Sequence, residues 1–360
     1  MPADPITALE ARTMTDIINN RHKPRLPLTA LLFGSGTRSK NLTTETVQVD
    51  TLVGTYEMAP MVNKDGKAVS ISRKNFDSAT IETPCIKLEM PLSDSDLLLQ
   101  RRAGNIDVDT DGVDYMKQSA LEQINEDIES MEIAIAYRTE WMISQLLQGG
   151  ISYTNDETGA SFALTLSKPA GNTFTVPILW NVEGALPLID IKNAKKVAQI
   201  DNHGPAPTIG LMGANAADAL RTRIEKGWVN PITRDSGVAA GSASLLSEWE
   251  DMGLCFIARL GNVDFWEVAA QYTDDKGVVT DAIRTDYVEF IPNSQTGVRD
   301  RITYYGKKRS ATAVEANRSI GKVFARSYID TIRDVWMSEI QSRPLTWWEH
   351  PQWYVSMKVI

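Results

Sequence analysis

Residues 341–360, QSRPLTWWEHPQWYVSMKVI, are the stretch that most strongly constrains the fold. Every second residue from Trp353 to Val359 is large and apolar, which is the period-two pattern of a half-buried β-strand. A second strand is predicted around Pro344–Leu345, with a turn at Glu349–Pro351 between the two strands. Chain ends usually fray unless they are tied down. A C-terminus with this many aromatic residues is therefore expected to close the fold.

Composition limits the possible classes of protein. The 360 residues predict two or three structural lobes, because single cores stop growing at roughly 250–300 residues. A net charge of −9 argues against general nucleic-acid binding, so only local basic patches can serve that role. Cys85 and Cys255 lie far apart in unrelated contexts, which argues against a secreted disulfide framework and favours synthesis in a reducing cytosol. We find no apolar run near the ~18 residues of a membrane span and no signal peptide.

Residues 1–43 are predicted to form an N-terminal arm, because prolines interrupt them and cations outnumber anions within an otherwise acidic chain. A solvated basic tail explains this composition as well as contact with a neighbouring subunit or with nucleic acid does. The cations that are candidates for such contacts are Arg12, Arg21, Lys23, Arg25, Arg38 and Lys40.

Residues 44–92 predict a long two- or three-stranded β-excursion. Apolar and polar residues alternate at Val47 and Val49 and again between Ile86 and Met90. Asn63–Gly66 supplies a turn in which glycine tolerates positive φ. Few of these residues can form a core, and an isolated hairpin is marginally stable in water. The segment is therefore expected to lie on a partner surface.

A single long helix is predicted over residues 112–148, because apolar side chains recur there at three- and four-residue spacing. These side chains are Val113, Met116, Ala120, Ile124, Ile128, Met131, Ile135, Met142 and Leu146. Gly149–Gly150 ends the run in the manner of a left-handed C-terminal cap. At 1.5 Å per residue the helix is about 50 Å long, which favours a role as a structural girder.

The remainder of the chain has a mixed α/β pattern. A polar hairpin is expected over 151–182, with its turn at 155–159. The further expected elements are helices over 188–198 and 215–224, a buried strand at 208–213, a hairpin joining 253–258 to 263–268, a strand at 287–292 and a loop at 227–247.

A second basic stretch runs from Arg299 to Arg326 and is only partly offset by Asp300 and Glu315. Solvated surface charge is one interpretation. The other is steering between copies of the chain, although at physiological salt such fields reach only about 8 Å. The cations of this stretch are Arg299, Arg301, Lys307, Lys308, Arg309, Arg318, Lys322 and Arg326.

Asp107–Gly112, with the sequence DVDTDG, matches the opening of a calcium-binding EF-hand loop. Gln118 stands where the loop needs a bidentate glutamate, and no helix is predicted before the motif. An acidic lead-in to the long helix is therefore the favoured interpretation. A calcium-dependent binding module stays as an alternative.

Catalytic motifs are not evident in this sequence. The three histidines, His22, His203 and His350, have no partner at metal-ligand or triad spacing. Neither cysteine lies in a catalytic signature, and the glycines at 34–36 are too few for a phosphate-binding loop. We predict no enzyme, no catalytic residue, no cofactor and no metal.

Segments spread along the chain carry a family resemblance. They are TTETV at Thr43–Val47 with APMV at Ala59–Val62, the approach to the long helix at Asp94–Arg102, EIAIA at Glu132–Ala136 with LLQGG at Leu146–Gly150, IQSRPL at Ile340–Leu345, and HPQWYVS at His350–Ser356. Together they resemble the major capsid proteins of tailed phages, in particular the family of the phage lambda head protein E. The likeness is weakest between about 155 and 285.

The resemblance implies the α+β capsid fold first seen in phage Hong Kong ninety-seven. The domains it implies are an N-terminal arm (1–43), an extended E-loop hairpin (44–92), a peripheral domain that contains the spine helix 112–148 (93–200), an axial domain (201–312) and a return to the peripheral domain (313–360).

The implied function is that of a head protein which assembles as hexamers and pentamers into an icosahedral shell around double-stranded phage DNA. Implied partners are copies of the chain itself, the packaged DNA, and portal and scaffold proteins, with or without a decoration protein. The implied location is the virion capsid, assembled in the host cytoplasm. Arg101 and Arg102, near the spine helix, join the arm cations as candidates to face DNA or neighbouring subunits. The alternative function is that of an encapsulin-like protein compartment, which has the same fold.

Overall fold

The computed structural model describes residues 26–33, 38–53, 75–92, 112–155, 159–166, 168–227, 250, 252–273, 277–293, 298–308, 320–331 and 335–360. The turn expected at 63–66, the acidic motif at 107–111 and almost all of the loop expected at 227–247 lie outside these residues.

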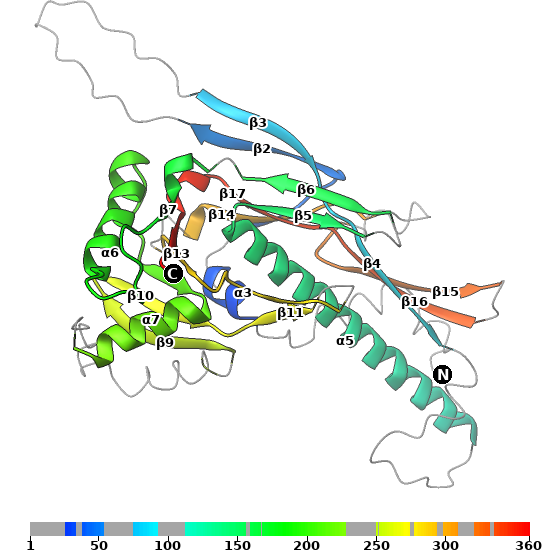
Figure 1. Ribbon diagram of the computed structural model, residues 1–360. Coiled ribbons are helices and arrows are strands. Elements are labelled where there is room, and N and C mark those ends of the chain that lie inside the picture. The colour runs from blue at the N-terminus through cyan, green and yellow to red at the C-terminus, as the bar shows by residue number, and fades with distance from the viewer. Residues whose placement is uncertain are drawn as a thin grey trace, which may run out of the picture.

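A six-stranded mixed sheet lies at one end of the described structure (Figure 1). Its strands, in order across the sheet, are β7 (Thr173–Thr175), β18 (Val355–Lys358), β13 (Tyr287–Ile291), β8 (Ile209–Met212), β10 (Val263–Val268) and β9 (Leu254–Leu260). β18 runs parallel to β7, and β10 runs parallel to β8, whereas the other pairs are antiparallel. The strand predicted from the end of the sequence is thus confirmed, and it lies inside the sheet rather than at its edge.

Different cores cover the two faces of this sheet, because neighbouring residues of a strand point in opposite directions. On one face Met212 and Phe290 pack against two helices. On the other face Leu211 and Ile291 pack with the C-terminal end of the long helix. The helices of the first face are α6 (Pro187–Lys196), which continues as the π-helical turn η2 (Val197–Asp201), and α7 (Ala214–Glu225). Both helices were expected from the sequence.

Helix α5 (Gly112–Leu147) confirms the single long helix predicted over residues 112–148. Its 36 residues span about 54 Å at 1.5 Å per residue. Ile128 and Ile135 pack in one core, whereas Leu146, further along the helix, packs in another. Gly149, at φ 115°, follows the end of α5 in the left-handed conformation that glycine tolerates. One helix therefore joins two cores that are separate from each other.

Two three-stranded sheets pack along α5 (Figure 1). Their strands are β1 (Arg38–Asn41), β14 (Arg301–Tyr305) and β17 (Pro344–Trp348) in the first, and β15 (Phe324–Asp330), β16 (Val335–Ser342) and β4 (Ile86–Leu92) in the second. The side chain of Glu339, fully buried on β16, forms ion pairs with Arg326 of β15 at 3.2 Å and with Lys87 of β4 at 3.1 Å. β17 confirms the second strand predicted near the C-terminus.

Three antiparallel hairpins complete the described strands. They are β2 (Thr46–Val53) with β3 (Asn75–Glu82), β5 (Gly150–Thr154) with β6 (Ser161–Thr165), and β11 (Gln271–Thr273) with β12 (Val279–Asp281). β4, which was a possible third strand of the excursion at 44–92, pairs with β16 instead. The polar hairpin expected over 151–182 ends at Thr165, and β7 further along joins the six-stranded sheet.

The structure places the later part of the expected arm inside the body. Helix α3 (Pro27–Leu32) contributes fully buried Leu28 to the core at the end of α5. Glu140 of α5 accepts hydrogen bonds from the backbone N–H groups of Leu28 at 2.5 Å and Thr29 at 2.8 Å, and from the Thr29 hydroxyl. Because α3 has no side-chain cap of its own, this carboxylate satisfies its first free N–H groups. This packing was not predicted, because residues 1–43 were taken as one basic arm, although residues 26–33 (LPLTALLF) are apolar and uncharged.

Within the described residues, every helix is too short or too polar to cross a membrane.

Candidate assembly surfaces

Of the eight cations predicted to face neighbours or DNA, the structure describes Arg38 and Lys40. Both are exposed on β1, which pairs in parallel with β14. Arg38 Nη2 lies 2.6 Å from Glu349 Oε2, so this guanidinium also contacts the C-terminal turn of its own chain. The other six lie outside the described residues: Arg12, Arg21, Lys23, Arg25, Arg101 and Arg102.

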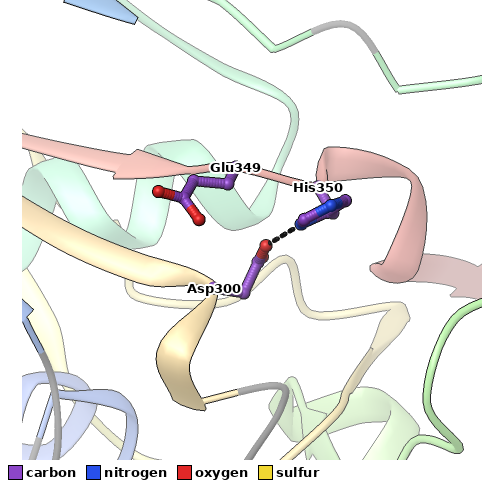
Figure 2. A group of neighbouring side chains, drawn as sticks. All are labelled: Asp300, Glu349 and His350. Carbon is purple, nitrogen blue, oxygen red and sulfur yellow. Dashed lines mark hydrogen bonds and ion pairs between the residues drawn. The ribbon is translucent and has the colours of Figure 1, made fainter. Parts of the chain in front are cut away.

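The turn predicted at Glu349–Pro351 is held by a buried carboxylate. Figure 2 shows Asp300, which precedes β14, beside His350, with Glu349 pointing toward the same space. Asp300 Oδ1 lies 2.5 Å from His350 Nδ1, and the Tyr354 hydroxyl donates to Asp300 Oδ2 at 3.2 Å. Burial raises the pKa of Asp300, against the opposing effects of His350 and Tyr354.

Aromatic stacking rigidifies the same turn. The rings of His350 and Trp353 stack with centroids 4.0 Å apart, and those of Trp348 and Tyr354 stack at 4.1 Å. Such pairs add to the stabilisation that burial of their apolar area provides. Trp348 and Trp353 therefore stabilise the turn between β17 and β18.

Within the described residues, Asp300, Glu349 and His350 form a group that could hold a metal ion, because one ligand atom from each lies within 4.8 Å of the others. Both oxygens of Asp300 already have partners, and the Arg38 guanidinium occupies Glu349. A metal ion here would have to displace a hydrogen bond and a cation. The contacts of Arg38 with Glu349 and of Asp300 with His350 connect β1 and β14 to the turn after β17, which indicates a structural role.

Two cations of the second basic stretch are buried, so neither interpretation made from the sequence applies to them. The guanidinium of fully buried Arg301 donates to the carbonyls of Leu32 at 2.8 Å and Pro292 at 2.5 Å. The ammonium of buried Lys308 donates to the carbonyl of Gly321. These carbonyls belong to other segments of the chain, so the sequence around each cation does not indicate that it is buried.

Exposed apolar side chains gather at three places in the described structure. Eight of them are in the segment before α6 and its first turn, at the β11–β12 hairpin and at the β15–β16 hairpin: Val182, Leu186, Leu188, Ile189, Val278, Val279, Tyr328 and Ile329. Leu188 and Ile189 are 49% and 51% exposed, although helical spacing alone would place apolar residues of α6 in a core. Clustered exposed apolar residues mark surfaces for association. These surfaces were not predicted from the sequence, because the periodicity of apolar residues does not reveal which of them other segments cover.

The β2–β3 hairpin is a further candidate surface. It lies at the edge of the molecule in Figure 1, and Val47 and Val49 near its base pack in the core at the end of α5. The base of the hairpin is thus fixed to the body, which agrees with an excursion that has little core of its own.

Comparison with known proteins assigns the chain. The family model for phage major capsid protein E matches residues 10–359. A crystal structure of a prophage protein from Escherichia coli CFT073, described as a capsid protein, has a TM-score of 0.68 at 17% identity and covers 98% of this chain and 99% of its own. The capsid of Ralstonia phage GP4 has a TM-score of 0.47 at 13% identity, covering 90% of this chain and 85% of its own.

The SrpI encapsulin of Synechococcus elongatus PCC 7942 has a TM-score of 0.45 at 10% identity and covers 96% of this chain and 94% of its own. No curated protein matches the chain. The α+β fold with its long spine helix is of the Hong Kong ninety-seven type. The chain belongs to the phage major capsid protein E family and is a major capsid protein.

Proposed function

We propose that this capsid protein assembles as hexamers and pentamers into an icosahedral shell that encloses double-stranded phage DNA. The observation that carries the proposal is the match to the phage major capsid protein E family over residues 10–359. Exposed apolar side chains on three separate elements support association of many copies. Assembly would take place in the host cytoplasm, and the mature location would be the virion capsid.

The proposal includes further partners. Portal and scaffold proteins are expected to act in assembly, with or without a decoration protein. Lys40, Arg101 and Arg102, with the cations of residues 1–25, are proposed to face DNA or neighbouring subunits.

Electron microscopy of the purified chain, beside its sedimentation profile, tests the proposal. We expect closed shells, or rings of five and six subunits. A uniform monomer at every protein and salt concentration would contradict self-assembly of this chain. Shells that hold protein cargo and exclude DNA would instead favour an encapsulin-like compartment.

The DNA-facing role is tested separately on assembled shells. Replacing Arg101 and Arg102 with glutamine is expected to leave shell formation intact and to weaken retention of double-stranded DNA, because each neutralised phosphate contact contributes to affinity. The matched control is replacement of Arg259, which is paired with Asp264 at 3.3 Å. Equal DNA retention by the two variants would contradict the assigned role of Arg101 and Arg102.

A further inference from the structure

One solvent-facing side of helix α6 combines apolar and basic side chains. Leu188, Ile189, Lys192 and Lys196 are all exposed, and their spacing of three and four residues places them on one side of the helix. Lys192 and Lys196 form no ion pair with any other described residue. We call these four residues the α6 face.

The opposite side of α6 accounts for the stability of the helix without the α6 face. Ile191, Ala194 and, in the following turn, Ala198 are buried against the six-stranded sheet. The apolar residues of the α6 face are therefore not needed for packing within the chain. Their exposure leaves them available for another molecule.

The β11–β12 hairpin carries a complementary surface. Val278 and Val279 are 53% and 56% exposed, and Asp281 is exposed beside them. We call these three residues the hairpin face. The hairpin face is thus apolar and acidic where the α6 face is apolar and basic.

The two faces lie on different sides of the six-stranded sheet. α6 packs on the side of Met212 and Phe290. The β11–β12 hairpin is fixed on the side of α5, where Tyr272 is buried and the Ser144 hydroxyl donates to the Ala282 carbonyl at 2.5 Å. Figure 1 shows the same separation, with α6 beyond the sheet and β11 beside α5. Two different patches on opposite sides are what a head-to-tail contact in a ring requires.

We propose that the α6 face of one copy docks against the hairpin face of the next copy within a ring. Leu188 and Ile189 would cover Val278 and Val279, while Lys192 and Lys196 would approach Asp281. A contact between two α6 faces is disfavoured because it would bring lysines together, and a contact between two hairpin faces would bring acids together. This inference rests on the proposed assembly into hexamers and pentamers, and it names the surfaces that meet.

Cysteine cross-linking tests the pairing in assembled particles. In a background with Cys85→Ser and Cys255→Ser, one preparation carries Ile189→Cys and a second carries Val279→Cys. After co-assembly and treatment with a short bismaleimide, we expect cross-linked dimers from the mixture and none from either preparation alone. A chain that carries both substitutions should give a ladder of higher species, because every contact in a head-to-tail ring repeats.

The matched control replaces Val279→Cys with Ile329→Cys, an exposed apolar residue on the β15–β16 hairpin. Shells without any Ile189–Val279 cross-link would overturn the inference and leave the proposed function standing. Dimers from Ile189→Cys alone would also overturn it, by showing a symmetric contact. Failure of the cysteine-free background and the unmodified chain to form any ring or shell would count against the proposed function itself.

Charge reversal provides a second, independent test. Lys192→Asp with Lys196→Asp is expected to slow assembly about tenfold at low salt, measured by light scattering, because charge complementarity steers association. Adding Asp281→Lys to the same chain should restore much of the rate. The control is Lys226→Asp at the end of α7. Since all these residues are exposed, circular dichroism should show an unchanged fold, and equal assembly rates for all variants would contradict the proposed contact.

Discussion

At the scale of single residues, Glu140 joins two segments that are far apart in the chain. It is fully buried on α5 and accepts three hydrogen bonds from Leu28 and Thr29. Burial raises the pKa of this carboxyl, although each of the hydrogen bonds lowers it. Glu140 therefore contributes by satisfying the donors of α3, and its removal would leave the buried Leu28 N–H group and the partly buried donors of Thr29 without this partner.

Replacing Glu140 with alanine is expected to lower the free energy of unfolding by about 1–3 kcal/mol, the usual effect of leaving buried donors unsatisfied. Urea denaturation of the unassembled subunit measures the change. Glu140→Gln keeps one acceptor and should lose less. Glu129→Ala, at an exposed position of the same helix, is the matched control. Equal stability of Glu140→Ala and Glu129→Ala would show that the contact to α3 is not stabilising.

The buried amine of Lys308 predicts a pH dependence. Burial, with a smaller contribution from Arg343, lowers the pKa of Lys308 from 10.5 to about 8. Between these two values the unfolded chain binds more protons than the folded chain, so the contribution of Lys308 to the free energy of unfolding rises with pH. The rise is on the order of 1–3 kcal/mol across the window.

Urea denaturation of the wild-type chain and of Lys308→Met at several pH values measures this contribution as the difference between the two proteins. The free energy of unfolding of the wild type should increase relative to that of Lys308→Met as the pH rises from about 8 to 10.5. Lys192→Met, at an exposed position, controls for the general titration of lysines. Parallel stability profiles for the wild type and Lys308→Met would contradict the lowered pKa.

At the scale of elements, β18 is central to the six-stranded sheet because it pairs with β7 on one side and β13 on the other. Val355 and Met357 are fully buried in the core that also holds α6 and α7. Loss of this strand exposes a core and leaves two strands with unpaired backbone groups, which is far costlier than loss of an edge strand.

Deletion of residues 355–360 is therefore expected to abolish the soluble folded subunit. Solubility, near-ultraviolet circular dichroism and limited proteolysis measure the outcome. Deletion of Ile360 alone is the control, because it retains the hydrogen bond from the Val359 N–H group to the Asp286 carbonyl at 2.9 Å. A soluble, protease-resistant chain without residues 355–360 would contradict the central role of β18.

At the scale of the whole molecule, the position of α3 and β1 changes how the N-terminal arm should be tested. Removal of residues 1–40 would delete α3 and most of β1, and with them fully buried Leu28. Removal of residues 1–25 leaves both elements intact. The shorter deletion is therefore the appropriate test of a role for the arm in assembly.

We expect the chain without residues 1–25 to remain folded and soluble and to form fewer or no closed shells, because the reach of the arm to neighbours is lost. The chain without residues 1–40 should lose stability as well. Electron microscopy measures shell formation, and thermal unfolding of the unassembled subunits separates the two effects. Normal shells from the shorter deletion would contradict the role of the arm in assembly.

The amino-acid sequence by itself determined the local elements and the family. Spacing of apolar residues predicted α5 and the strand at 353–359, because side-chain periodicity is a property of neighbouring residues. The closing segments around Pro344 and His350 also carried the resemblance to the capsid family, which the match over residues 10–359 confirms. The division into arm, peripheral and axial domains stays a prediction.

Only the tertiary structure decided which charged residues are buried and which apolar residues are exposed. Arg301 and Lys308 lie in a basic stretch that resembles a solvated surface, yet carbonyls from other parts of the chain enclose their cations. Leu188 and Ile189 lie in a helix with ordinary spacing, yet about half of each side chain remains exposed. Burial depends on segments brought together from distant positions, and periodicity within one segment carries no information about them.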